Sequence, residues 1–224
     1  MKAAEITVLE EVELDNPIFI EALPGVGHVG KLVADHMIDE LDATKFAEIY
    51  SPTFPPQVLV GEDGKIENMI NELYYIRDLG EDNQDIIIIG GNTQSLSPDG
   101  QYIVCSEILE FLEPFNISRI FTLGGVPTGQ PVEDPRVLGA ASDEAHIELL
   151  KEVGVEMRSN DGGIVGASGL FLGLGMRKGI YGACLMGETP GYFIDAESAE
   201  GVLLKLADLL NFEINTEKLD ERAE

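Results

Sequence analysis

The sequence predicts an α/β domain in which a mostly parallel sheet is covered by helices on both faces. Strand-like segments alternate with helical segments of about 10 to 15 residues, which is typical of parallel sheets. The four consecutive isoleucines Ile86 to Ile89 suit a strand buried on both faces. Apolar residues make up 44% of the 224 residues, enough for a substantial core.

The amino-terminal half predicts several short strands around one helix. Apolar residues recur at three- and four-residue steps from Val29 to Leu41, which indicates an amphipathic helix. Asp63-Gly64 is a turn signal between two short strand-like runs and predicts a hairpin. We expect an edge strand at 6–9, a central strand at 18–20, further strands at 46–50, 58–60, 65–68 and 72–77, and a helix at 29–41.

The carboxyl-terminal half predicts longer helices between buried strands. Ser142 is expected to cap one helix, with Asp143 and Glu144 in its first turn, and Asp195 to cap the last helix. The apolar, glycine-rich stretch 164–176 favours a helix packed closely on the sheet, and it is too short for the ~20 residues of a membrane span. We expect strands at 86–89, 119–123, 137–141 and 180–186, and helices at 101–115, 142–153 and 195–210. We find no repeat and no linker, which predicts one domain at 1–214 and a polar tail at 215–224.

Acidic side chains dominate the composition. The formal charge is −27, from 41 acidic and 14 basic residues. Such a surface repels phosphate backbones and anionic lipids, so we expect no nucleic-acid or membrane partner. The charge serves solubility, or it attracts a basic protein partner. Cys105 and Cys184 are expected to be buried free thiols, which predicts a soluble, cytoplasmic protein.

One glycine motif matches a dinucleotide-binding pattern. Gly25-Val-Gly27-His-Val-Gly30 follows an expected strand and opens an expected helix, where backbone N–H groups can face a phosphate. The acidic residue expected at the end of the next strand is missing, because that strand ends Ile49-Tyr50-Ser51. The other interpretation is a tight turn in which glycines permit close packing.

Polar and glycine residues follow several expected strands and define a candidate rim for a ligand or a partner. Ligands of open α/β sheets bind at the carboxyl ends of the strands. Glu188 has a second interpretation, in which it only accepts N–H bonds from a loop. The candidate rim consists of Gly25, Gly27, Gly30, Gln94, Gly124, Gly125, Glu188 and Tyr192.

No catalytic residue, metal site or cofactor site is predicted. His28, His36 and His146 have no zinc-binding spacing, and His146 is expected at the surface. Ser168 is not in a G-x-S-x-G nucleophile elbow. The glycine-rich segment 162–175 lacks the Lys-Ser/Thr ending of a P-loop.

Six motifs follow one another along the chain: LPGVGHVGK at 23–31, EIYSP at 48–52 with PPQV at 55–58, GQY at 100–102, FTLGG at 121–125, GGIVGASGL at 162–170 and CLMGETPGY at 184–192. In this order they make the chain similar to the archaeal branch of the proteasome assembly chaperone family. The resemblance implies a single α/β domain similar in fold to nucleoside phosphorylases and hydrolases. It also implies homo-oligomers and a role in bringing proteasome α subunits together.

The sequence therefore predicts a non-catalytic, homo-oligomeric, chaperone-like protein that acts on proteasome subunits or on a paralogue. Family members that dock on the α ring often end in a hydrophobic residue, tyrosine and any residue, whereas this sequence ends Arg222-Ala223-Glu224. Three explanations stay open: that the chain uses another surface, that a paralogue carries the hydrophobic-tyrosine ending, and that the role of the chain is different. The alternative function is an enzyme or sensor that binds a nucleoside-like or other small ligand at the rim.

Overall fold

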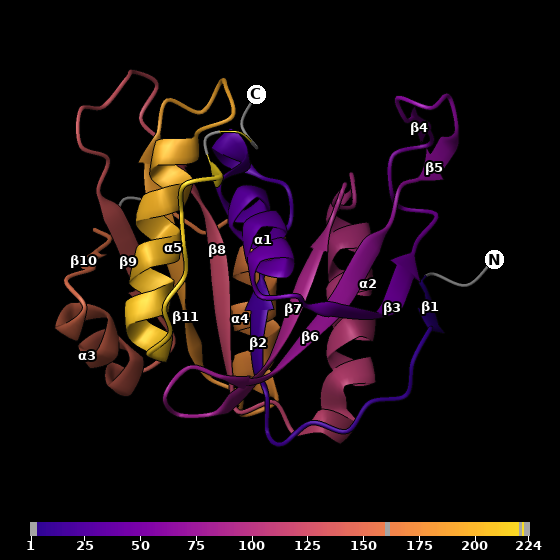
Figure 1. Cartoon of the computed structure of the whole chain (residues 1–224), viewed down its shortest axis with the longest axis horizontal. Helices are drawn as coiled ribbons and strands as arrows, with labels where there is room; N and C mark the ends of the chain where they lie inside the picture. Colours follow the sequence, from indigo (N-terminus) through magenta and orange to yellow (C-terminus); the bar gives the residue numbers. More distant parts are fainter. Residues whose placement is uncertain (1–3, 160–161, 220, 222–224) are drawn as a thin grey trace.

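Nine strands of the described residues form one sheet, in the order β1-β3-β6-β7-β2-β8-β11-β9-β10. The structure is a computed structural model that describes residues 4–159, 162–219 and 221. A separate hairpin, β4–β5, projects at the upper right of Figure 1. The strands are β1 Glu5–Val8, β2 Ile18–Glu21, β3 Thr44–Tyr50, β4 Val58–Val60, β5 Ile66–Asn68, β6 Asn71–Leu79, β7 Gln84–Gly91, β8 Arg119–Pro127, β9 Val137–Ala141, β10 Glu156–Met157 and β11 Gly182–Thr189.

The four central strands are parallel, and the sheet as a whole is mixed. β7, β2, β8 and β11 pair in parallel, as the continuous apolar runs predicted. β6, β3 and β1 extend one side in antiparallel pairs, and β9 pairs antiparallel with β11. β10 pairs in parallel with β9 at the far edge. Parallel pairing, which the sequence predicted, is therefore found in the centre and at that edge, and antiparallel pairs join the remaining strands. The connection from Leu79 to Gln84 is a tight turn, which joins antiparallel neighbours, whereas parallel neighbours need a crossover.

Helices cover both faces of the sheet, as the sequence predicted. α1 (Val29–Glu40) and α5 (Ala196–Leu210) lie on one face, and α2 (Pro98–Leu112) and α4 (Ala167–Arg177) lie on the other (Figure 1). α3 (Glu144–Glu152) lies beside β9 and β10. Two short 3₁₀ turns, η1 (Val26–His28) and η2 (Glu113–Phe115), border α1 and α2. The sheet separates two buried apolar clusters, one under each helix layer.

The start of α3 differs from the expectation by one residue. Asp143, not Ser142, is the N-cap, and its carboxylate accepts the backbone N–H of His146 at 2.9 Å. Ser142 instead donates its hydroxyl to the Gly182 oxygen at 3.0 Å, which ties it to β11. The His146 side chain is only 12% exposed, so its expected surface position is wrong, because it packs edge-on against Phe121. The two-residue strand β10 was not expected.

The chain after α5 returns along α1. The His36 ring Nε2 lies 2.6 Å from the Asn215 oxygen, and Leu219 is buried in the core beneath α1 and α5. The described part of the expected polar tail therefore places one apolar side chain, Leu219, in the core. The boundary between residues 214 and 215 stays a prediction, and Arg222 to Glu224 lie outside the described residues.

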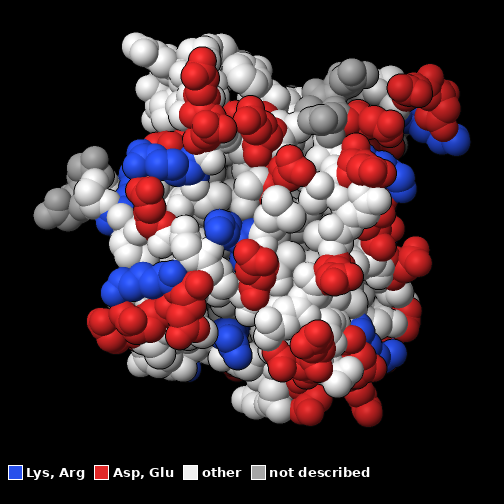
Figure 2. All heavy atoms as spheres, turned by 60° about the vertical axis from the view of Figure 1, so that its left-hand side comes forward, with Lys and Arg blue, Asp and Glu red and all other residues white. Residues whose placement is uncertain are grey.

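Acidic side chains are the more frequent charged groups at the surface. Figure 2 shows them gathered in several clusters on the face that includes the β9–β10 edge, with fewer basic groups between them. Within residues 4–159 and 162–219, no helix is long and apolar enough to cross a membrane.

Candidate functional site

A cavity of about 490 Å³ lies at the carboxyl ends of the central strands, the edge at the top of Figure 1. Gly25, Gln94, Gly124 and Gly125 of the predicted rim line it. Gly27, Gly30, Glu188 and Tyr192 do not belong to its lining. The other lining residues are Leu23, Val26, Gln101, Leu123, Val126, Pro127, Arg158, Gly163, Ile164, Val165, Gly166, Ser168, Cys184 and Met186.

Two rim glycines lie where the chain after β2 approaches β8 closely. A methyl group on Gly30 would lie 2.4 Å from the Leu123 backbone oxygen. A methyl group on Gly125 would lie 2.5 Å from the Val26 backbone oxygen. Gly27 has a φ of 61°, and a methyl group there would lie 2.7 Å from the Thr189 hydroxyl. These contacts support the packing interpretation of the motif from Gly25 to Gly30.

Gln94 joins three segments at the cavity. Its Nε2 donates to the Pro24 oxygen at 2.8 Å, and its Oε1 accepts the Ala167 N–H at 3.1 Å. Gln101 on α2 donates to the same Oε1 at 3.0 Å. Gln94 therefore holds the first turn of α4 against the loop after β2.

Glu188 belongs to an ion pair outside the cavity. Its carboxylate accepts the Arg136 Nη2 at 2.6 Å and Nε at 3.0 Å, and the Arg136 backbone N–H at 3.2 Å. These bonds to Arg136 hold the pKa of Glu188 below its usual range. The contacts support the interpretation in which Glu188 fastens its neighbouring loop.

Tyr192 lies on the same edge and points away from the protein core. Its side chain is 67% exposed, and its ring contacts that of Phe193 edge-on at 5.3 Å. An exposed aromatic pair on a loop is suited to contact with another molecule.

The most unusual buried group is Glu21, at the end of β2, which the sequence analysis did not single out. Its carboxylate accepts the Ser168 hydroxyl at 2.7 Å and the Leu23 N–H at 3.0 Å. Burial raises the pKa of Glu21 to about 7, although both hydrogen bonds oppose the shift. The pair fastens α4 to β2. In the sequence, the only sign of this group is that the acidic residue Glu21 directly follows the apolar run Ile18-Phe19-Ile20.

Glu21 stands in a row of buried polar groups across the central strands. It pairs in register with Thr122 on β8, and Thr122 pairs with Cys184 on β11. Burial raises the pKa of the Cys184 thiol to about 12 and that of Cys105 above its usual range. Both cysteines are buried and free, as predicted, and such thiols are poor nucleophiles at neutral pH.

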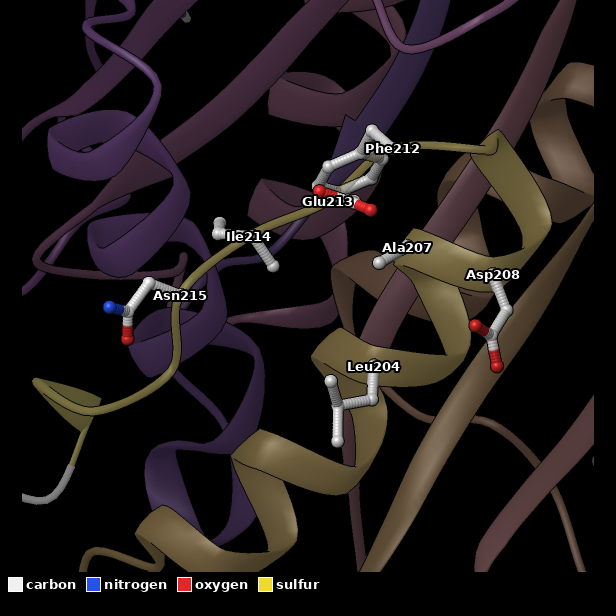
Figure 3. A pocket seen from close by; sticks show the side chains of 7 residues that line it. All are labelled: Leu204, Ala207, Asp208, Phe212, Glu213, Ile214 and Asn215. Carbon is white, nitrogen blue, oxygen red and sulfur yellow. The ribbon is translucent and has the colours of Figure 1, made fainter.

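The described residues form no metal-binding group, and a second hollow lies on another face of the protein. Among residues 4–159, 162–219 and 221, no three His, Cys, Asp or Glu side chains are grouped to hold a metal ion. A hollow of about 520 Å³ lies between α5 and the segment 212–215. Figure 3 shows that its side chains, among them Leu204, Asp208 and Asn215, do not converge on one point. The cavity beside Ser168 is therefore the better candidate site.

A helix-covered sheet with a cavity at the carboxyl ends of its parallel strands defines an α/β domain, and ligands of such domains bind at this edge. Comparison with protein families gives the particular family: the model described as PAC2 family matches residues 19–224. The chain belongs to the PAC2 family, which confirms the suspected relationship to proteasome assembly chaperones.

Three relatives show how far the similarity extends. The crystal structure of Pyrococcus furiosus PbaB, described as an archaeal proteasome activator, is 43% identical with a TM-score of 0.93, covering 100% of this chain and 95% of that one. P. furiosus PbaA, described as an archaeal homolog of proteasome-assembly chaperone, is 29% identical with a TM-score of 0.81, covering 98% and 91%. The uncharacterized protein MJ1210 of Methanocaldococcus jannaschii is 46% identical over 210 residues, which are 94% of this chain and 80% of that protein.

Proposed function

We propose that this chain is a non-catalytic, chaperone-like protein that binds proteasome subunits or a paralogous chaperone. Membership of the PAC2 family and full-length similarity to PbaB and PbaA support this role. We also propose that it acts in the cytoplasm, that it forms homo-oligomers, and that its acidic surface favours basic partners.

The observation that carries the proposal is a group of exposed apolar side chains along the carboxyl edge of the sheet. Tyr192, Val165 and Leu96 are 67%, 90% and 70% exposed, and they come from three different loops. Large apolar side chains that several loops expose at one edge are suited to contact with a partner protein. The carboxyl-edge surface consists of Val26, Leu96, Tyr102, Val165, Tyr192, Phe193 and Ile194.

Co-purification with mutated carboxyl-edge residues tests the proposal. The tagged chain should recover proteasome subunits or a paralogue from its own cells at physiological salt. The double substitution Tyr192→Ser and Phe193→Ser should reduce recovery at least about tenfold, because aromatic residues dominate the binding energy of interfaces. Tyr181→Ser is the matched control, since Tyr181 is 43% exposed just before β11, at the opposite edge. Recovery of no proteasome subunit and no paralogue, or equal recovery with both variants, would contradict the proposal.

Two further measurements separate the possible roles. Light scattering gives the mass in solution, and a monomer mass would contradict the homo-oligomer. Addition of the chain to assembled proteasome particles and to separate α subunits distinguishes activation from assembly. Faster peptide hydrolysis by the particle would indicate an activator, as PbaB is described, and faster formation of particles would indicate an assembly chaperone.

The cavity below the carboxyl-edge surface favours a second property, the binding of a small molecule. Its volume lies within the range of about 300–1,000 Å³ that is usual for ligand sites. The enzyme-or-sensor alternative therefore stays a proposal beside the protein-binding role.

A further inference from the structure

We propose that the cavity beside Ser168 binds a small organic anion, with an apolar body against its walls and a carboxylate or phosphate paired with Arg158. The proposal gives a ligand class to the small-molecule alternative and does not depend on the docking of proteasome subunits. It rests on three features of the cavity: its charge, its walls and its free space.

The described lining of the cavity carries a charge opposite to that of the protein. Of its described lining residues none is acidic and one, Arg158, is basic, in a chain with 41 acidic and 14 basic residues. Four other hollows of 490–590 Å³ each include at least one Asp or Glu. Among the described residues, the cavity therefore offers an anionic ligand one cation and no acidic side chain.

Arg158 has N–H donors that no described residue accepts. Its Nη1 donates to the Gly163 oxygen at 3.2 Å and lies 3.6 Å from the Met186 sulfur. Within the described part of the chain it forms no salt bridge, and its Nη2 and Nε have no acceptor. Arg158 is half-buried as a residue and lines the cavity. A guanidinium in that state can form a two-pronged bond with a carboxylate or a phosphate.

The remaining lining suits an apolar body with few polar groups. Val126, Ile164 and Met186 offer apolar surface from two strands and the loop before α4. Gln101 and Ser168 carry the neighbouring polar groups. The carboxyl of Glu21 is not part of the lining, and both of its oxygens already accept protein hydrogen bonds. Such a lining is typical of small-molecule sites.

Gly124 leaves the free space next to Ser168. A methyl group on Gly124 would have the Ser168 hydroxyl, 3.9 Å away, as its nearest neighbour, so there is room for a Cβ at this position of the cavity lining. A methyl group on Gly173, on the exposed side of α4, would meet nothing within 4 Å. The two glycines therefore make a matched pair for blocking the cavity.

The test measures binding of an eight-carbon series to the full chain by titration calorimetry. Octanoate and octyl phosphate carry the two candidate anionic groups, octanol is the neutral control, and octylammonium is the cationic control. Inorganic phosphate tests the head group without an apolar body. We expect octanoate or octyl phosphate to bind about tenfold or more tightly than octanol, because a charge-assisted pair is added. Whichever of octanoate and octyl phosphate binds more tightly shows whether the head group is a carboxylate or a phosphate.

Two substitutions place the binding in this cavity. Arg158→Gln should remove the preference for the anion over octanol, whereas Arg177→Gln, at an exposed arginine, should retain it. Gly124→Val should weaken binding of the whole series about tenfold or more, whereas Gly173→Val should not.

Several outcomes would overturn the proposal. For the probes, these are octylammonium binding as tightly as the anions and no binding up to about 10 mM probe. For the variants, they are an anion preference that Arg158→Gln does not remove and binding that Gly124→Val does not weaken. Thermal unfolding of each variant without probe shows whether it is folded, and the Gly124→Val result decides if Arg158→Gln is unfolded.

Discussion

At the residue scale, Glu21 joins the two central features of the fold, β2 and α4. Its carboxylate is fully buried and accepts bonds from Ser168 and Leu23. Burial disfavours the charged form and raises the pKa from 4.5 to about 7. Between these values the folded state retains a proton that the unfolded state has released, so stability falls as the pH rises.

We predict that Glu21→Gln removes part of the pH dependence of unfolding. From pH 5 to pH 7.5 the wild type should lose stability relative to the variant, by up to roughly 3 kcal/mol, because a neutral amide has no charge to bury. Urea unfolding at several pH values measures the difference. Glu107→Gln, at an exposed position on α2, is the control for the loss of one carboxylate. A constant difference between Glu21→Gln and wild type across this range would show that Glu21 does not titrate there.

At the scale of elements, glycine sets how closely α1 approaches the sheet. Gly30 lies in the first turn of α1, against the backbone of β8. The sequence offered two interpretations of the Gly25–Gly30 motif, a phosphate-binding loop and a packed turn, and could not decide between them. The decision depends on the distance from the helix to a strand that lies about ninety residues later in the chain.

We predict that Gly30→Ala destabilises the protein by about 3 kcal/mol, because the new methyl group would lie 2.4 Å from the Leu123 oxygen and α1 would have to move. Gly173→Ala, in an open position on α4, should instead gain up to about 1 kcal/mol from the better helix propensity of alanine. Urea unfolding midpoints measure both. Equal effects of the two substitutions would refute the close contact of α1 with β8.

At the scale of the whole molecule, charge is the dominant property. A formal charge of −27 on one domain produces repulsion that the local ion pairs, such as Lys31 with Asp35, do not cancel. Most of these ion pairs are at the surface, where each contributes little. The stability of the domain should therefore depend strongly on ionic strength.

We predict that the unfolding temperature rises by several degrees between roughly 0.01 M and 0.5 M NaCl, because the screening length falls from about 30 Å to a few ångströms. Differential scanning fluorimetry at constant pH measures the shift. KCl should give the same rise as NaCl, since screening depends on ionic strength and not on a particular cation. An unchanged or lower unfolding temperature would mean that repulsion does not limit stability.

The sequence by itself determined the local structure and the family. Apolar runs predicted the strands β7, β8 and β11, and a three- and four-residue periodicity predicted the helix α1. Asp195 predicted the start of α5. These signals can be recognised in the sequence because each lies within a few neighbouring residues. Ordered motifs identified the family, and the sequence also placed Gln94 and Gly124 at one edge.

Only the tertiary structure decided which residues meet. Ser168 and Glu21 are 147 positions apart and bond across two elements. Arg158 borders a cavity that has no described acidic side chain, and Glu188 turns away to Arg136. The physical reason is that strand order and register bring together residues that are distant in the chain, and hydrophobic periodicity does not encode that order.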